Sequence, residues 1–114
     1  MVKMIIMFNR LAGMSREEFM NYRRNVHAPL LLAIPEARYI KKFVVSYPVT
    51  PPDHLYGAPG YDALVEAWFD NIEEMNRLFQ SENFLTKVDP DHENFIDLSS
   101  IKRIVADEIT VIGF

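Results

Sequence analysis

Two segments with the pattern of a capped amphipathic helix alternate with apolar segments of strand length, and this order is the strongest constraint on the fold. Ser15 followed by Glu18 fits a capping box, and Asn71 with Glu74 repeats it before the second helix. Apolar residues recur at steps of three and four after each cap. The strand-like segments are residues 2–8, 38–47, 61–70 and 101–107. This order predicts an α+β, ferredoxin-like βαββαβ fold, a four-stranded antiparallel sheet with two helices on one face.

The length of 114 residues supports a single domain, 1–114, with a modest core. The first strand is apolar on both faces, whereas a strand with one exposed face alternates. Two helices cover one face of the sheet, and no segment remains for the other. We therefore predict a homodimer in which two sheets pack face to face, with the apolar tail 108–114 extending the last strand and helping to close the interface. The alternative, a monomer, exposes an apolar patch of a size that is uncommon on soluble monomers.

The composition excludes several classes of function. The formal net charge is −4 and basic residues are not clustered, so nucleic acid is not an expected partner. The chain has no cysteine, which rules out disulfides and favours the cytoplasm. No segment approaches membrane-spanning length, and the apolar start is interpreted as a strand because it is too short for a signal peptide. The glycines are scattered and form no phosphate-binding loop, so no cofactor held through a phosphate is expected. The histidines lack the spacing of metal ligands, so no metal is expected.

The helical segment 15–35 carries the first candidate for catalysis, His27. His27 is predicted about 90° from the centre of the apolar stripe, which consists of Phe19, Tyr22, Val26 and Leu30. Pro29 removes a helical hydrogen bond and predicts a bend or a new helix start directly after His27. A half-buried imidazole beside such an irregularity is suited to general acid or base catalysis. The alternative is a structural histidine that bonds a backbone group freed by Pro29.

A second histidine, His54, lies in the proline-rich segment 48–60, which is predicted to be a long functional loop. Two histidines from different elements can divide the acid and base roles across one cavity, so His54 is the expected partner of His27. A loop histidine that is only solvated is the alternative. His92 lies in the polar run DPDHEN and is interpreted as a solvated side chain.

Three aromatic side chains are candidates for binding the substrate. Tyr39 opens the second predicted strand and can donate a hydrogen bond to a ligand oxygen, and Trp68 on the third strand can stack on an aromatic ligand. Tyr22 lies on the apolar face of the first helix. Packing in the core is the alternative role for these residues. Arg103, near a strand edge, is interpreted as a surface charge.

The runs MSREEFMNYRRNVHAPL and IPEARYIKKF, and EAWFDNIEEMNRLFQSE further on, resemble the signature of EthD-domain proteins. The resemblance covers nearly the whole chain, and its most specific part runs from SREEF to HAPL and the proline that follows. It implies membership of the dimeric α/β-barrel superfamily, whose ferredoxin-like subunits dimerise through their sheets. It also implies a role like those in which EthD-type proteins are implicated, in bacterial ether degradation and in polyketide and aromatic metabolism.

Within that superfamily the chain is also similar to the methylmuconolactone methylisomerases. In those enzymes a histidine late in the first helix, a loop histidine and a strand tyrosine line the pocket, which implies this role for His27, His54 and Tyr39. The chain departs from their pattern at Ala28 and Pro29, directly after the helix histidine. Haem-degrading members use a histidine on the second helix, which the run NIEEMNRLFQ lacks, so haem is not an expected cofactor.

These features predict an enzyme without a cofactor that performs acid–base chemistry of isomerase or lyase type on a small apolar, aromatic or lactone-like metabolite. His27 would move a proton, His54 would assist it or hold a ligand oxygen, and Tyr39 would orient the substrate. Two alternatives stay open. One is a cofactor-free monooxygenase of the same superfamily, and the other is a protein that binds a hydrophobic ligand without converting it.

Overall fold

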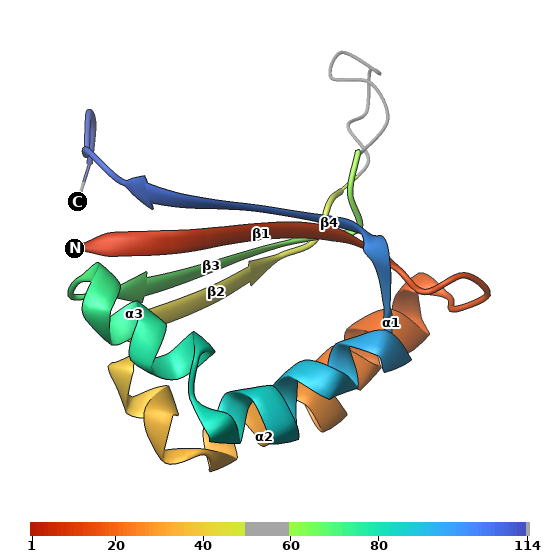
Figure 1. Cartoon of the computed structure of the whole chain (residues 1–114). Coiled ribbons are helices and arrows are strands. Elements are labelled where there is room, and N and C mark those ends of the chain that lie inside the picture. Colours follow the sequence, from red (N-terminus) through yellow and green to blue (C-terminus); the bar gives the residue numbers. More distant parts are fainter. Residues whose placement is uncertain (50–59, 114) are drawn as a thin grey trace.

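The computed structural model describes residues 1–49 and 60–113, and the strands in this part of the chain form an antiparallel sheet (Figure 1). The sheet has four strands in the order β2-β3-β1-β4. Their bounds are β1 (Val2–Arg10), β2 (Lys42–Ser46), β3 (Ala63–Phe69) and β4 (Ile96–Asp107). Since β1 and β2 are separated by β3 and joined through helices, the chain has the predicted α+β, ferredoxin-like fold.

The helical segments lie on one face of the sheet, which we call the inner face (Figure 1). The first helical arm comprises α1 (Arg16–Tyr22), η1 (Arg23–His27), α2 (Ala28–Ala33) and η2 (Pro35–Tyr39). The second helical arm comprises α3 (Ile72–Phe79), η3 (Phe84–Val88) and η4 (Asp89–Asn94). Of these segments, η1 and η3 are π-helical turns, and η2 and η4 are 3₁₀ helices. Within residues 1–49 and 60–113, no helix is long and apolar enough to cross a membrane.

Both predicted helix starts are present. The Ser15 hydroxyl accepts a hydrogen bond from the Glu18 N–H at 3.1 Å, and the Glu18 carboxylate accepts one from the Ser15 N–H at 3.1 Å. Asn71 caps α3 by accepting a bond from the Glu74 N–H at 2.8 Å. Each cap satisfies a backbone donor that the start of a helix leaves without a partner, and a cap contributes about 1 kcal/mol.

The core lies between the inner face and the two helical arms. The inner face of β3 is fully buried, as its alternation predicts, through Ala63, Val65, Ala67 and Phe69. One cluster of buried side chains gathers around Phe19 and Phe95, and a second gathers around Leu78 and Val88. Because burial of apolar side chains is the main stabilising term, these clusters hold the arms against the sheet.

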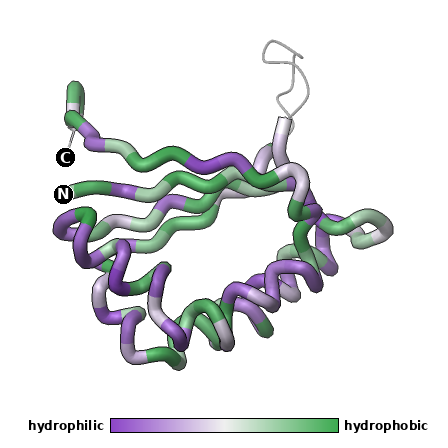
Figure 2. The backbone as a smooth tube through the Cα atoms, in the orientation of Figure 1, coloured by the Kyte–Doolittle hydropathy of each residue, from purple (hydrophilic) through white to green (hydrophobic). Residues whose placement is uncertain are grey.

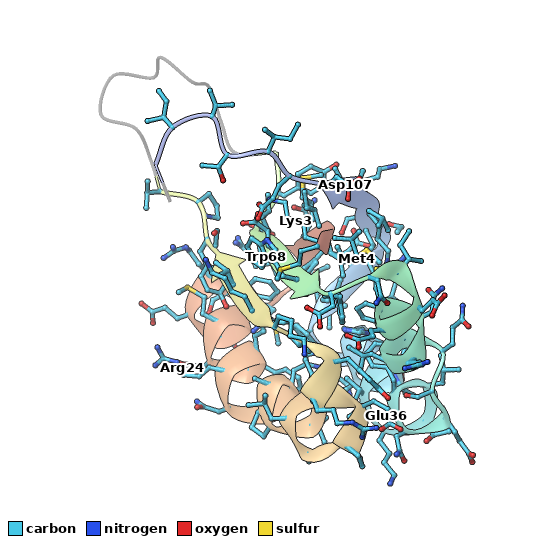
Figure 3. The ribbon with its side chains drawn as sticks, turned by 90° about the vertical axis from the view of Figure 1, so that its left-hand side faces the viewer. Lys3, Met4, Arg24, Glu36, Trp68 and Asp107 are labelled. Carbon is cyan, nitrogen blue, oxygen red and sulfur yellow. The ribbon has the colours of Figure 1, made fainter. Side chains whose placement is uncertain are left out.

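The opposite face of the sheet, the outer face, carries no helix (Figure 1). The register places Ile5 beside Ile104 on this face, and Ile104 is 53% exposed. Along these strands hydrophobic residues are interrupted by hydrophilic ones (Figure 2). At one end Lys3 lies beside Trp68, with its ammonium 5.1 Å from the centre of the indole ring (Figure 3). The outer face therefore combines apolar and charged side chains, since the register also places Glu66 beside Ile5 and Lys102 beside Met7.

The second strand is shorter than predicted. It begins at Lys42 rather than at residue 38, because Pro35 starts the 3₁₀ helix η2, which ends at Tyr39. Proline favours the first turn of a helix, where its missing N–H leaves no donor to be satisfied. The prediction that Tyr39 opens a strand is therefore wrong.

The fourth strand is longer than predicted and begins at Ile96. Its polar start, DLSS, hides the strand in the sequence, and its pairing with β1 shifts register there. The Ser100 hydroxyl accepts a hydrogen bond from the Asn9 N–H at 2.8 Å and donates one to the Asp97 carbonyl at 2.6 Å. A side chain thus satisfies the backbone donor that the irregular register leaves without a strand partner.

Residues 108–113 follow β4 without joining the sheet. Glu108 accepts a hydrogen bond from the Trp68 indole at 2.7 Å and forms an ion pair with Lys3 at 3.2 Å. The apolar side chains beyond it are exposed, namely Ile109, Val111 and Ile112. The prediction that the tail extends the fourth strand is wrong for the single subunit, and its part in a dimer interface stays a prediction.

Candidate active site

A cavity of about 340 Å³ lies between the inner face and the helical arms. Its volume is at the lower end of the roughly 300–1,000 Å³ that is usual for small-molecule sites. Most of its wall is apolar, including Met4, Ile6, Phe8, Val65, Ala67 and Phe95. Polar side chains interrupt this wall at Arg23, His27, Asp89, His92 and Arg103. An apolar pocket with a few converging polar groups is the usual form of a small-molecule site.

His27 is the last residue of the π turn η1 and is only 6% exposed. The turn closes through a hydrogen bond from the Ala28 N–H to the Arg23 carbonyl, five residues earlier. Pro29 follows directly and has no N–H of its own, so the predicted irregularity is present at the predicted place. Such π turns inside helices are frequent at functional sites.

The π turn also changes which residues face the core. The buried side chains of the first arm are spaced four apart, at Phe19, Arg23, His27 and Leu31. In a regular α helix, with 3.6 residues per turn, residues four apart drift gradually around the helix and leave a single face. A π turn contains more residues per turn, so here it keeps side chains four apart on the same face. Val26 is 41% exposed in consequence. The predictions that Val26 belongs to the apolar stripe and that His27 lies half buried on its flank are wrong.

Asp91 of η4 holds His27 by a hydrogen bond between its Oδ2 and the imidazole Nδ1, at 3.0 Å. Its other oxygen, Oδ1, accepts bonds from the Tyr22 hydroxyl at 2.6 Å and the Asn94 amide at 3.0 Å. Burial raises the pKa of Asp91, but the hydrogen bonds that it accepts outweigh burial and hold its pKa below the usual value. An ionised carboxylate only accepts, so Nδ1 of His27 carries the hydrogen.

The pKa of His27 is lowered to about 4, mainly by burial and then by the nearby His92, against the opposing hydrogen bond to Asp91. The imidazole is therefore neutral at physiological pH, with its lone pair on Nε2. No hydrogen bond joins Nε2 to any other residue that the structure describes. The arrangement leaves a proton acceptor at the wall of the cavity, oriented by a carboxylate on the other nitrogen.

His92 also lines the cavity, and its ring centre is 4.5 Å from that of His27. Its Nδ1 lies 3.1 Å from Oδ1 of Asp89, and its side chain is 22% exposed. His92, interpreted from the sequence as a solvated side chain, is partly exposed in the structure but also lines the cavity. Two histidines, each bonded to a carboxylate of its own, meet at one wall of the cavity.

Arg23 lies one helical turn before His27 and is 7% exposed. Burial lowers the pKa of its guanidinium, and the Tyr47 hydroxyl opposes this shift. The guanidinium carbon lies 5.4 Å above the ring of Phe43, and no carboxylate among the described residues forms an ion pair with it. A buried cation at an apolar wall is suited to hold an oxygen atom of a ligand.

Of the aromatic residues predicted to bind the substrate, Tyr22 lies beside the site. Its hydroxyl bonds to Asp91, and its ring stacks on Phe95 with a centre distance of 5.2 Å. Tyr22 is not among the described residues that line the cavity, so it positions the carboxylate that holds His27.

Tyr39 and Trp68 are not brought to the site. Neither belongs to the cavity wall formed by the described residues. Tyr39 packs against the helices with its ring between Arg38 and Arg77, at 4.7 and 5.9 Å. Trp68 lies on the outer face, where Lys3 covers its ring. His54 lies outside the described residues, so its partnership with His27 stays a prediction.

Asp91, His92 and Arg23 belong to the site although the sequence patterns did not predict them there. One sequence signal could have indicated that Arg23 is buried with His27, namely its position four residues earlier. That spacing, repeated along the arm, keeps side chains together on the buried face only if the helix contains a π turn. Asp91 and His92 lie in a polar run whose one cue is Pro90 near the start of a 3₁₀ helix. No periodicity in the sequence indicates that this run meets the first helical arm.

The fold and the site define a ferredoxin-like α+β protein with a histidine–aspartate pair at the wall of an apolar cavity. Residues 11–99 match the EthD domain family, and the chain belongs to this family. The resemblance carried by the SREEF and HAPL runs is thereby confirmed. The similarity to methylmuconolactone methylisomerases stays a prediction.

Two relatives are named as dehydratases. The dehydratase ustZ of Ustilaginoidea virens is 34% identical over 105 residues, which span 84% of this chain and 75% of the relative. The conidial pigment biosynthesis dehydratase EthD of Metarhizium robertsii is 29% identical over 99 residues, which span 79% of this chain and 70% of the relative. The family therefore includes named enzymes with which this chain shares most of its length.

Solved structures share the fold. An EthD-family protein from Bacillus halodurans superposes with a TM-score of 0.72 at 18% identity, over 96% of this chain and 99% of the other. A protein of unknown function from Bacteroides fragilis, described as dimeric and ferredoxin-like, superposes with a TM-score of 0.64 at 16% identity, over 94% and 95% of the two chains. At such identities the likeness shows the fold alone.

Proposed function

We propose that this protein is an EthD-type dehydratase, which removes water from a small, largely apolar, oxygen-bearing metabolite by acid–base chemistry of its own side chains. The observation that carries the proposal is the pair of His27 and Asp91 at the wall of an apolar cavity. The names of the two dehydratase relatives support the same class of reaction. Loss of water is a lyase reaction, one of the two types that the sequence predicts.

In this proposal Nε2 of His27 removes a proton from the carbon next to a carbonyl group. The electron pair of that C–H bond forms a C=C bond, and the bond from the next carbon to its hydroxyl breaks, with its electrons leaving on oxygen. The lowered pKa keeps the imidazole neutral and able to accept the proton. Asp91 then stabilises the imidazolium through Nδ1, as carboxylate partners of catalytic histidines do.

Arg23 is proposed to hold the carbonyl oxygen of the substrate. Negative charge grows on this oxygen as the proton leaves, and a fixed cation in a dry site stabilises it more strongly than water does. Arg23 is suited to this because it is buried beside His27 and has no carboxylate partner among residues 1–49 and 60–113. The base and the oxyanion partner thus come from the same π turn.

The cavity wall favours aromatic or partly reduced cyclic substrates. Phenylalanine rings supply much of it, at Phe8, Phe43, Phe79, Phe84 and Phe95. Aromatic side chains bury a large apolar area and pack on flat rings in stacked or edge-on contact. Together with the pigment-pathway name of the Metarhizium relative, this supports a polyketide-like or aromatic substrate.

The test uses hydroxytetralones, which are bicyclic β-hydroxy ketones that become fluorescent naphthols when they lose water. The His27→Asn variant retains a donor near the position of Nδ1 but has no counterpart of Nε2. We expect its turnover to fall about 10²–10⁴-fold, the usual contribution of a positioned base. Near-UV circular dichroism checks that it folds. Equal turnover of the two proteins, or a wild-type protein that binds these probes without converting them, contradicts the proposal.

We also propose that two subunits associate through their outer faces. The apolar side chains on this face support the proposal, because in a monomer Ile104 is 53% exposed to water. Solved neighbours with this fold from Bacteroides fragilis and Thermobifida fusca are described as dimeric, which supports self-association as well. The cavity lies on the inner face, so each subunit would keep its own site.

A further inference from the structure

We propose that His92 is the proton donor to the departing hydroxyl group, and that water therefore leaves from the same face of the substrate from which His27 takes the proton. This inference rests on the proposed dehydratase function and deepens it. Three features of the cavity support it: the contact between the two rings, their separate carboxylates, and the apolar side chains of the opposite wall.

The two rings meet although they come from different helical arms. His27 ends η1 of the first arm and His92 lies in η4 of the second, with ring centres 4.5 Å apart. Both belong to the cavity wall. A substrate whose reacting carbons lie over Nε2 of His27 therefore places the neighbouring hydroxyl within reach of His92. An elimination needs this arrangement, because the two reacting bonds are on adjacent carbons.

The surroundings of the two rings favour different roles for them. Two imidazolium ions in contact repel each other, so a single protonation is favoured. His27 is the more buried side chain, at 8% exposed against 22% for His92, and it faces the additional positive charge of Arg23. His92 is closer to water and is bonded to Asp89, whose side chain is 49% exposed. These features favour His27 as the base and His92 as the proton donor.

The other charged groups at the cavity do not alter this assignment. Asp91 is occupied by the bonds from His27, Tyr22 and Asn94. Arg103 reaches the cavity from β4. Guanidinium groups do not give up a proton in proteins, so an arginine is not a proton donor.

The proton balance of the reaction closes with these two rings. His27 gains the proton from carbon, the C–H electrons form the double bond, and the C–O bond breaks. The departing oxygen keeps the electrons of that bond and takes a proton from a ring nitrogen of His92, which forms water. Afterwards His27 is protonated and His92 is neutral, and transfer of one proton between the two rings, directly or through the released water, restores the starting state. No further reactant is required.

The opposite wall of the cavity fixes the stereochemistry. It is formed by the strands, and apart from Arg103 the described side chains there are apolar, as at Met4, Ile6 and Val65. Both histidines belong to the helical arms, which lie together on one face of the sheet (Figure 1). Because no described acid on the sheet side can protonate the departing oxygen, both proton transfers occur on the helical side. The geometry thus points to a syn elimination.

The test separates the base step from the loss of water. Tetralone has the acidic C–H group but no hydroxyl to lose, so its deuterium exchange in heavy water, followed by NMR, reports the base alone. Hydroxytetralone reports the whole reaction. For His92→Gln we expect tetralone exchange within about threefold of the wild type and hydroxytetralone turnover lower by at least about 10²-fold. For His27→Asn we expect both to fall together.

The outcomes distinguish the two proposals. If His92→Gln loses exchange and turnover in the same proportion, or converts hydroxytetralone as the wild type does, His92 is not the proton donor. If His27→Asn keeps tetralone exchange, the proposed base is wrong, and the dehydratase assignment fails with it. The ratio of the two rates does not depend on the fraction of folded protein, so partial unfolding of a variant does not obscure the result. Hydroxytetralone deuterated on one face tests the stereochemistry, and loss of the label anti to the hydroxyl contradicts a syn elimination.

Discussion

The Nδ1 atom of His27 lies 3.0 Å from Oδ2 of Asp91, although 64 residues separate the two in the sequence. This bond joins the two helical arms at the wall of the cavity and fixes the tautomer of the imidazole. In the sequence His27 has an alternative role as a structural histidine bonded to a backbone group. The observed partner is instead a side-chain carboxylate, the arrangement found where a histidine acts as base.

The first prediction concerns this bond. Asp91→Asn replaces the ionised acceptor with a neutral amide, which no longer stabilises the imidazolium that forms when His27 takes a proton. We expect kcat for hydroxytetralone to fall at least about tenfold, with a much smaller change in KM, because the substrate does not contact Asp91. Steady-state kinetics measure both constants. Tyr22→Phe removes one bond to the same carboxylate and is expected to have a smaller effect of the same kind. A loss confined to KM contradicts the positioning role.

A second prediction concerns the stability of the fold in acid. The pKa of His27 is about 4 in the folded chain and about 6.5 when the chain is unfolded. Between these values the unfolded state binds the proton and the folded state does not, so protonation favours unfolding as the pH falls. The free energy of unfolding should therefore decrease by about 3 kcal/mol from pH 6.5 to pH 4 through this group alone.

Urea unfolding at several pH values measures this decrease. His27→Asn has no group that titrates at this position, so its free energy of unfolding should depend less steeply on pH over the same range. Carboxylates such as Asp91, whose pKa is lowered by hydrogen bonds, lose their contribution only at the acid end of this range and below it. Parallel curves for wild type and variant between pH 6.5 and pH 4 contradict the assignment of a neutral, buried His27.

A third prediction concerns the buried arginine. Arg23→Met keeps an unbranched side chain of similar length but removes the cation proposed to hold the carbonyl oxygen. We expect kcat/KM for hydroxytetralone to fall about 10²–10³-fold, as for the loss of one oxyanion partner. Arg24→Met is the matched control, because Arg24 is the next residue, is exposed and points away from the core (Figure 3). Equal effects of the two variants would show that the charge of Arg23 plays no part in the reaction.

A fourth prediction concerns the outer face. Ile104→Glu places a carboxylate in the centre of the proposed subunit interface, where it would lose its hydration without gaining a partner. We expect the variant to sediment as a monomer at micromolar concentration, under conditions in which the wild type is a dimer. Ile72→Glu is the control, since Ile72 on α3 has nearly the same exposure, 52% against 53%. Analytical ultracentrifugation distinguishes the species, and a monomeric wild type overturns the proposed interface.

The fold follows from sequence patterns that act over short distances. The caps at Ser15 and Asn71 and the alternation along β3 each concern neighbouring residues, and all three are present in the structure. Errors arise where a side chain replaces a backbone partner or where proline changes the helix type. Ser100 satisfies the backbone of Asn9 and hides the start of β4, and Pro35 converts the predicted start of β2 into a 3₁₀ helix.

The candidate site was only partly predictable, because it depends on contacts between distant segments. His27 is recognisable from its position before Pro29, but its burial is not, since that depends on the π turn. Asp91 and His92 resemble surface residues in a polar run until the second helical arm is placed against the first. Tyr39 and Trp68 are aromatic and at least partly buried, which are features that substrate-binding residues share. Both nevertheless pack away from the cavity, Tyr39 against the helices and Trp68 on the outer face.

The π turn η1 has a consequence for how this site is inherited. A π turn holds one residue more than the same length of α helix, so deleting one residue between Arg23 and His27 would leave a regular α helix. Phe19, Arg23 and the imidazole would then be spaced four and three apart, which keeps them on one face of that helix. The turn is thus what the gain of one codon in a plain helix would produce, with the capped start at Ser15 and the buried histidine both kept in place.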